Sequence, residues 1–119
     1  MHRFKKLEMW QQSRVFCIEI YTVTSLFPDS ERFGLTNQLR RASVSIPSNI
    51  AEGSSRNSNK DFSRFLDIAI GSAYEIETQL LISSDLNFIA EEKLNTLNEK
   101  LQSITKMMYH FKKSLNLTV

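Results

Sequence analysis

The sequence predicts an all-α protein that folds as an antiparallel up-down four-helix bundle. Its 119 residues contain only 3 Gly and 2 Pro, where average usage gives about 14, so the chain lacks the turn residues that an all-β fold needs. Apolar side chains recur at steps of three and four residues in four successive segments, which is typical of helices with a buried face. With 41% hydrophobic and 24% charged residues, residues 1–119 are expected to form one domain.

The first helix is predicted over about residues 7–26. One side carries Leu7, Trp10, Cys17, Ile18, Tyr21 and Thr24, and Val15, Phe16, Ile20 and Leu26 are spread around the rest. A helix that is apolar on more than one side is expected to bury a second surface.

The second helix is predicted over about residues 31–53. Pro28 favours a turn before it, and Asp29 or Ser30 can cap its first turn. Pro47 lies inside the helix and predicts a kink or an interruption, while Gly53 suits a left-handed residue that ends it. Its apolar stripe consists of Leu35, Leu39, Ala42, Ile46 and Ile50.

The third helix is predicted over about residues 59–84, because Ser58 and Asp61 form a capping signal at its start. Gly71 in its middle predicts a tight crossing with another helix. The main apolar stripe consists of Phe62, Phe65, Leu66, Ala69, Ala73, Ile76 and Leu80, and Ile68, Tyr74 and Ile82 lie outside it. These three predict a second buried face.

The fourth helix is predicted over about residues 90–115. Its apolar residues follow a heptad pattern through Leu94, Leu97, Leu101, Ile104, Met108, Phe111 and Leu115. Glu91 and Glu92 in the first turn, and Lys112 and Lys113 in the last, suit the helix dipole.

Catalytic and metal-binding signatures are missing from the sequence. One cysteine, Cys17, and two histidines, His2 and His110, do not make a four-ligand zinc set. No glycine-rich phosphate loop or nucleophile elbow is present. We therefore expect no metal, no cofactor and no enzymatic activity. The chain also lacks an apolar leader or a run of ~20 apolar residues, which predicts a cytoplasmic protein without a membrane partner.

The formal charge of +2 is unevenly distributed along the chain. Residues 1–60 carry nine Lys or Arg and five Asp or Glu, residues 61–99 carry two and eight, and residues 100–119 carry four and none. This segregation indicates either a surface with regions of both signs or complementary helix faces within one bundle.

Residues 35–53, LTNQLRRASVSIPSNIAEG, are the most distinctive part of the sequence. Together with residues 4–10, 62–66 and 70–80, they closely resemble the four-helix-bundle proteins encoded in intervening sequences of bacterial 23S ribosomal RNA genes. The resemblance covers about residues 4–115 in collinear order. It implies an antiparallel four-helix bundle that assembles as a ring-like homopentamer. A related branch contains accessory proteins of diversity-generating retroelements, in which a basic pentamer is implied to bind reverse transcriptase and nucleic acid. This sequence resembles that branch in fold only.

Basic side chains are the candidate contacts to nucleic acid, because a ring would multiply their field and phosphate binding needs little more. The candidates are Arg3, Lys5, Lys6, Arg14, Arg40, Arg56, Lys60, Lys106, Lys112 and Lys113. In the segments that carry these basic residues, only Phe4 and Tyr109 offer aromatic rings on which bases could stack. Recognition of the backbone or of shape is therefore favoured over base readout.

Polar residues near predicted helix contacts form a second candidate set, expected to be a buried structural network that fixes helix register or a subunit seam, with a pocket or phosphate contact as the alternative. These are Arg41, Asn49, Glu52, Ser72 and Glu75. Arg40 and Arg41 are adjacent and project about 100° apart, so one is expected to face solvent and the other a neighbouring helix.

These observations favour a non-enzymatic, homo-oligomeric accessory or scaffold protein that binds structured RNA or DNA through a basic face. The alternative is a protein–protein interaction module in which the acidic residues 61–99 dock a basic partner and nucleic acid plays no part.

Overall fold

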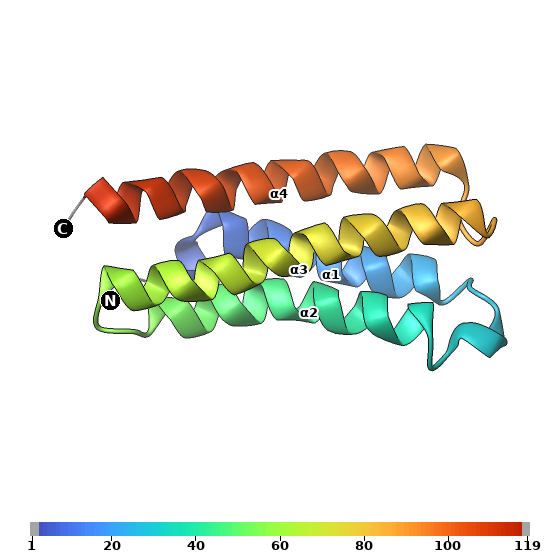
Figure 1. The fold of residues 1–119 in the computed structure, drawn as a ribbon, viewed down its shortest axis with the longest axis horizontal. Coiled ribbons are helices and arrows are strands. Elements are labelled where there is room, and N and C mark those ends of the chain that lie inside the picture. Colours follow the sequence, from blue (N-terminus) through green and yellow to red (C-terminus); the bar gives the residue numbers. More distant parts are fainter. Residues whose placement is uncertain (1–2, 118–119) are drawn as a thin grey trace.

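The computed structural model describes residues 3–117 as four antiparallel α-helices (Figure 1). These are α1 (Glu8–Thr24), α2 (Leu35–Ser54), α3 (Asn59–Asp85) and α4 (Glu91–Leu117), with the short 3-10 helices η1 (Phe4–Lys6) before α1 and η2 (Asp29–Glu31) before α2. Each α-helix contacts the next, and α4 returns to α1, so α1 and α3 lie diagonally across the bundle. The predicted four-helix bundle is confirmed, and it measures 47 × 23 × 20 Å.

The core runs along the bundle axis and contains the predicted heptad seam of α4. Leu97, Leu101 and Met108 of this seam are almost fully buried. On α1 the sequence did not single out the side that faces the core, where Phe16 and Ile20 are buried while Ile18 is 64% exposed. Since α1 is apolar on several sides, its periodicity did not identify the side that faces the core.

The second helix begins at Leu35, four residues later than predicted. Residues 29–31 form η2 instead, and the Leu35 amide donates a hydrogen bond to Glu31 Oε1 at 3.1 Å. Pro28 starts this 3-10 turn, and the Glu31 side chain satisfies one of the unpaired amides at the start of α2. Neither Asp29 nor Ser30 caps α2, whose N-cap is Gly34.

Pro47 does not interrupt α2, which continues as one α-helix from Leu35 to Ser54. The proline removes one backbone hydrogen bond, to the carbonyl of Ser43. Ile46 and Ile50 on either side of it are fully buried. Packing of these neighbours on the core offsets the loss of the bond.

The tight helix crossing occurs at Gly53 and not at Gly71. A methyl group on Gly53 would lie 2.8 Å from atoms of Phe62 and Phe65, whereas one on Gly71 would meet nothing within 4 Å. Gly53 is buried within α2 and has no positive φ, so its predicted role as a left-handed helix end is wrong. Its missing side chain allows α2 to approach the first turns of α3.

The start of α3 is as the sequence predicts. Ser58 is the N-cap, and its hydroxyl accepts a hydrogen bond from the Asp61 amide at 3.1 Å.

Among the described helices, none combines the length and hydropathy that a membrane span requires.

Replacing Gly53 with alanine is expected to destabilise the protein by about 1–3 kcal/mol, because the methyl group overlaps two phenylalanine side chains. Gly71→Ala is the matched control. It places the same methyl group in open space on an exposed helix position, and should stabilise by about 0.5–1 kcal/mol through helix propensity. Urea unfolding of both variants measures the difference. Equal effects of the two substitutions would contradict a close contact at Gly53.

Candidate nucleic-acid interface

The bundle topology gathers basic side chains at one end of the molecule. The N-terminal ends of α1 and α3 and the C-terminal ends of α2 and α4 meet there, together with η1 (Figure 1). We define this basic end as residues 3–8, 52–67 and 106–117. It carries nine Lys or Arg against four Asp or Glu, a net formal charge of +5. Its basic residues are Arg3, Lys5, Lys6, Arg56, Lys60, Arg64, Lys106, Lys112 and Lys113.

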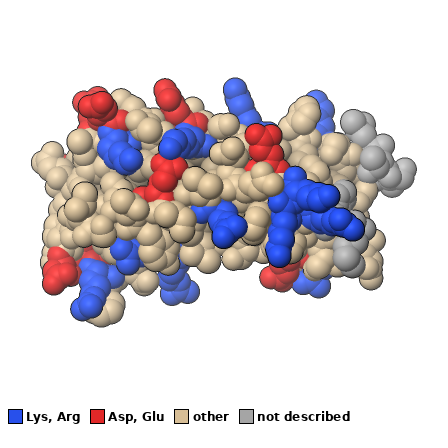
Figure 2. Space-filling view, turned by 180° about the vertical axis from the view of Figure 1, so that it is seen from behind, with Lys and Arg blue, Asp and Glu red and all other residues tan. Residues whose placement is uncertain are grey.

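The opposite end, defined as residues 25–35 and 81–95, is acidic. It carries Asp29, Glu31, Asp85, Glu91 and Glu92 against Arg32 and Lys93, a net formal charge of −3. The loops that form it are held together by Phe27 and Phe88, whose ring centroids are 5.6 Å apart. Seen from behind, the Lys and Arg side chains gather toward the right-hand end of the molecule, which is the basic end (Figure 2). The charge is therefore segregated along the bundle axis.

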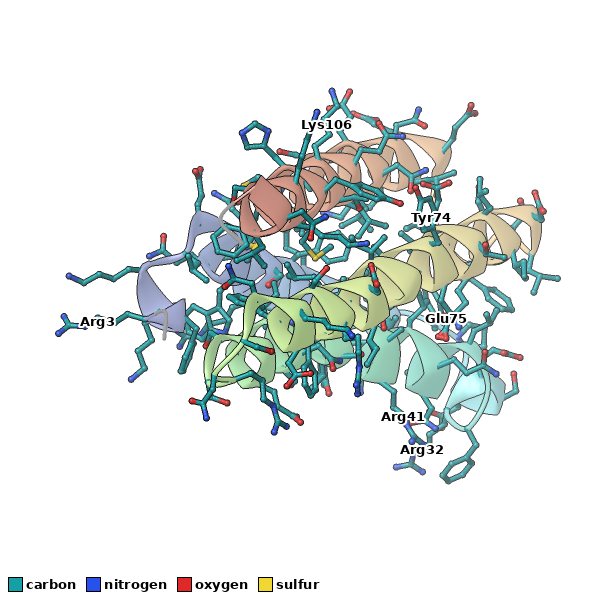
Figure 3. The ribbon with its side chains drawn as sticks, turned by 60° about the vertical axis from the view of Figure 1, so that its left-hand side comes forward. Arg3, Arg32, Arg41, Tyr74, Glu75 and Lys106 are labelled. Atoms are coloured by element: carbon teal, nitrogen blue, oxygen red, sulfur yellow. The ribbon has the colours of Figure 1, made fainter. Side chains whose placement is uncertain are left out.

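Eight of the ten predicted nucleic-acid contacts lie at the basic end, and six of them have no ion pair in the described part of the chain. These six, all exposed, are Arg3, Lys5, Lys6, Lys60, Lys106 and Lys113. Lys112 pairs with Asp67, and Arg56 pairs with Glu52 at 3.0 Å. Arg3, the residue before η1, projects away from the bundle (Figure 3). Sequence reasoning missed Arg64, a basic residue one turn into α3 that lies 3.9 Å from Asp61.

The other two predicted contacts, Arg14 and Arg40, lie further along α1 and α2. The Arg14 guanidinium sits 5.5 Å from the centroid of the Trp10 ring. Arg40 is half-buried and binds the end of α1: its Nε donates to Thr24 Oγ1 at 2.9 Å, and a second nitrogen donates to the Tyr21 carbonyl at 3.3 Å. It also stacks over the Tyr21 ring at 4.6 Å. These contacts make Arg40 a structural residue.

Arg41 is the member of the arginine pair that faces solvent. It lines a polar groove of about 380 Å³ between α2 and α3, together with Glu75 (Figure 3). Both side chains are exposed in the single chain, as is Glu52, so these three residues are not part of a network buried within the bundle. The physical reason is their position on the outward edges of α2 and α3.

The polar contacts that join α2 to α3 are made by uncharged side chains. Ser45 Oγ and Ser72 Oγ are 2.9 Å apart, and Asn49 Nδ2 donates to Ser45 Oγ at 3.0 Å. Two turns further along α3, Gln79 Nε2 donates to Gln38 Oε1 at 3.2 Å. Of the predicted network, Ser72 and Asn49 therefore lie together, while Arg41 and Glu75 border them from outside.

Exposed apolar side chains lie on the two diagonal helices. Val15 and Ile18 on α1 are 57% and 64% exposed, and Ile68 and Ile82 on α3 are 52% and 43% exposed. Because α1 and α3 lie diagonally across the bundle, their outward faces lie on opposite sides of it. The predicted apolar surface of α3 outside the core is therefore present.

Tyr74 on α3 reaches α4, where its hydroxyl lies 3.3 Å from that of Tyr109. This hydrogen bond and the neighbouring phenol raise the pKa of Tyr74 above its usual value of 10.0. The Tyr74 hydroxyl therefore stays protonated near neutral pH. In the described residues no cluster of three or more His, Cys, Asp or Glu side chains is placed to hold a metal ion.

Comparisons with known proteins agree with this architecture. A family model described as 23S rRNA-intervening sequence protein matches residues 5–110, and the chain belongs to this family. A solved structure of a protein with unknown function, from the S23 ribosomal protein family of Bacteroides thetaiotaomicron, is similar with a TM-score of 0.81. The two chains are 26% identical, and the match covers 88% of this chain and 95% of the other. A search of curated proteins gave no match. The predicted resemblance is confirmed.

Replacing Arg40 with alanine is expected to destabilise the protein by about 1–2 kcal/mol, because it removes hydrogen bonds from a charged group to the end of α1. Arg41→Ala removes the same charge from an exposed position and should change stability by less than about 0.5 kcal/mol. Thermal unfolding of the two single variants measures this. A larger loss for Arg41→Ala would reverse the assignment of the pair.

Proposed function

We propose that this chain is a non-enzymatic accessory or scaffold protein of the cytoplasm that binds structured RNA or DNA through its basic end. The observation that carries the proposal is the convergence of six basic side chains, from the η1 segment, α3 and α4, on one end of a bundle whose other end is acidic; among residues 3–117 none of the six has an ion pair. A cationic surface of this kind attracts the phosphate backbone without reading sequence. The acidic end would repel the same polyanion, and so orient the molecule on it.

Assembly into a ring-like homopentamer would strengthen this binding. A closed ring needs two different, complementary surfaces on each subunit, and the outward apolar faces of α1 and α3 lie on opposite sides of the bundle. Docking Val15 and Ile18 of one copy against Ile68 and Ile82 of the next would cover both faces. Five copies in one ring would then present their basic ends together, multiplying the local field.

Binding to a ribosomal RNA fragment is expected to weaken steeply as salt rises, because each phosphate contact releases condensed counterions. Lys6→Gln with Lys113→Gln should reduce the slope of log K against log salt by about 1 for each lysine. The matched control is Arg32→Gln with Lys93→Gln, which removes the same charge from the acidic end. It should leave the slope unchanged. Fluorescence anisotropy across a salt series gives these slopes.

Equal loss of affinity in the two double variants would show that net charge alone matters, and would contradict a specific basic end. Absence of binding at low salt would contradict the proposal altogether.

The ring predicts a molar mass in solution of about five chains, and a single charge on either apolar face should lower it. Ile18→Asp on α1 and Ile82→Asp on α3 each place a carboxylate where apolar contact is expected. Leu26→Asp is the matched control, because Leu26 is 82% exposed but lies at the acidic end, away from both faces. Light scattering measures the mass of each variant. A monomeric wild-type protein, or dissociation by Leu26→Asp alone, would contradict this arrangement.

A protein-interaction module is the second candidate function, and one observation favours it. Leu26, Phe33 and Leu86 are 82%, 86% and 51% exposed at the acidic end, which also carries the carboxylates Glu91 and Glu92. Exposed apolar side chains on an end with a net negative charge suit a basic protein partner. A stable oligomer that binds no nucleic acid at low salt would favour this alternative.

A further inference from the structure

The basic end contains an apolar groove that the sequence did not reveal. It has a volume of about 730 Å³ and lies between the start of α1 and the last turns of α4. The groove exists because the two neighbours differ in length: α1 has 17 residues and α4 has 27. In consequence α4 runs past the start of α1 (Figure 1), and side chains that α1 would otherwise cover are left open. Its apolar lining consists of Leu7, Met9, Met107, Tyr109 and Phe111.

One edge of the groove is cationic. Lys106 and Lys113 lie on the same side of α4, two turns apart, with His110 between them. Both lysines are exposed and have no ion pair in the described part of the chain, whereas the adjacent Lys112 is engaged by Asp67. Across the groove Glu8 is the single carboxylate among its lining residues. Figure 3 shows Lys106 projecting outward from α4.

This combination of a cationic edge and an apolar floor matches the two parts of a nucleotide. A phosphate needs the lysines, and the flat face of a base favours contact with aromatic and apolar side chains such as Phe111 and Met107. Phe111 is held in place from below by Phe62, with ring centroids 5.2 Å apart. A base inside a duplex is already stacked on its neighbours, so only an unpaired base is available for such a contact.

We propose that this groove receives an unpaired base of the nucleic acid held at the basic end, with the flanking phosphates on Lys106 and Lys113. The inference rests on the proposed function and adds to it the class of nucleic acid preferred. A duplex interrupted by a bulged or looped-out nucleotide would bind more tightly than a continuous duplex of equal charge. The groove therefore favours nucleic acids that carry an unpaired nucleotide, whereas the rest of the basic end binds phosphates independently of sequence.

The test uses two RNA hairpins with the same stem and one bulged nucleotide, which in the second hairpin is abasic. Both carry the same phosphates, so the comparison isolates the contribution of the base. The hairpin with the base is expected to bind roughly 5- to 150-fold more tightly to the wild-type protein. Met107→Gln keeps the charge but makes the groove polar, and should abolish most of this difference.

Lys60→Gln is the matched control, because it removes a phosphate contact at the basic end outside the groove. It should weaken both hairpins by the same factor. Equal affinity of the two hairpins for the wild-type protein would overturn the base-binding groove and leave the proposed function standing. Absence of binding to both hairpins at low salt would overturn the proposed function and this inference together. The wild-type comparison needs no variant, so it decides the matter even if Met107→Gln does not fold.

Discussion

The close packing of α2 on α3 at Gly53 is the constraint on which the rest of the structure depends. With no side chain at this position, Phe62 and Phe65 lie against the α2 backbone, and a methyl group there would approach them to 2.8 Å. The contact fixes the register of the two helices, which in turn pairs Ser45 with Ser72 and Gln38 with Gln79. The same register brings the end of α2 and the start of α3 to the end of the bundle where η1 and the last turns of α4 also lie. The charge segregation along the axis follows from this arrangement.

Helical periodicity predicted four helices and most of the core, because α2, α3 and α4 each present one apolar stripe that became buried. It did not predict the core side of α1, where apolar residues surround the helix and only the neighbouring helices decide that Phe16 is buried and Ile18 is exposed. The sequence also did not show which of the two helical glycines makes a close contact with a neighbouring helix. Gly71 sits in a stripe of small residues yet faces open space, whereas Gly53 lies at a predicted helix end and makes the close contact.

Eight of the ten basic residues singled out from the sequence lie at one end, but their convergence depends on topology, which joins segments separated by about 40 residues of sequence. Arg40 and Arg41 illustrate the limit. Their angular separation shows that they point in different directions, but only the position of α1 decides that Arg40 binds Thr24 and Tyr21 while Arg41 faces solvent. The apolar groove was equally inaccessible, since it arises from the unequal lengths of α1 and α4. In the proposed function the basic side chains attract the polyanion, and the apolar groove at the same end receives one exposed base.

The central claim is that nucleic acid binds one end of this molecule, and hydrogen–deuterium exchange with and without a ribosomal RNA fragment tests it most directly. The claim predicts slower exchange in residues 3–8, 54–60 and 106–117 when RNA is added at low salt, because bound RNA covers η1, the turn between α2 and α3, and the last turns of α4. Residues 25–35 and 81–95 should exchange at unchanged rates. Protection centred on the acidic end, or spread evenly along all four helices, would contradict the account.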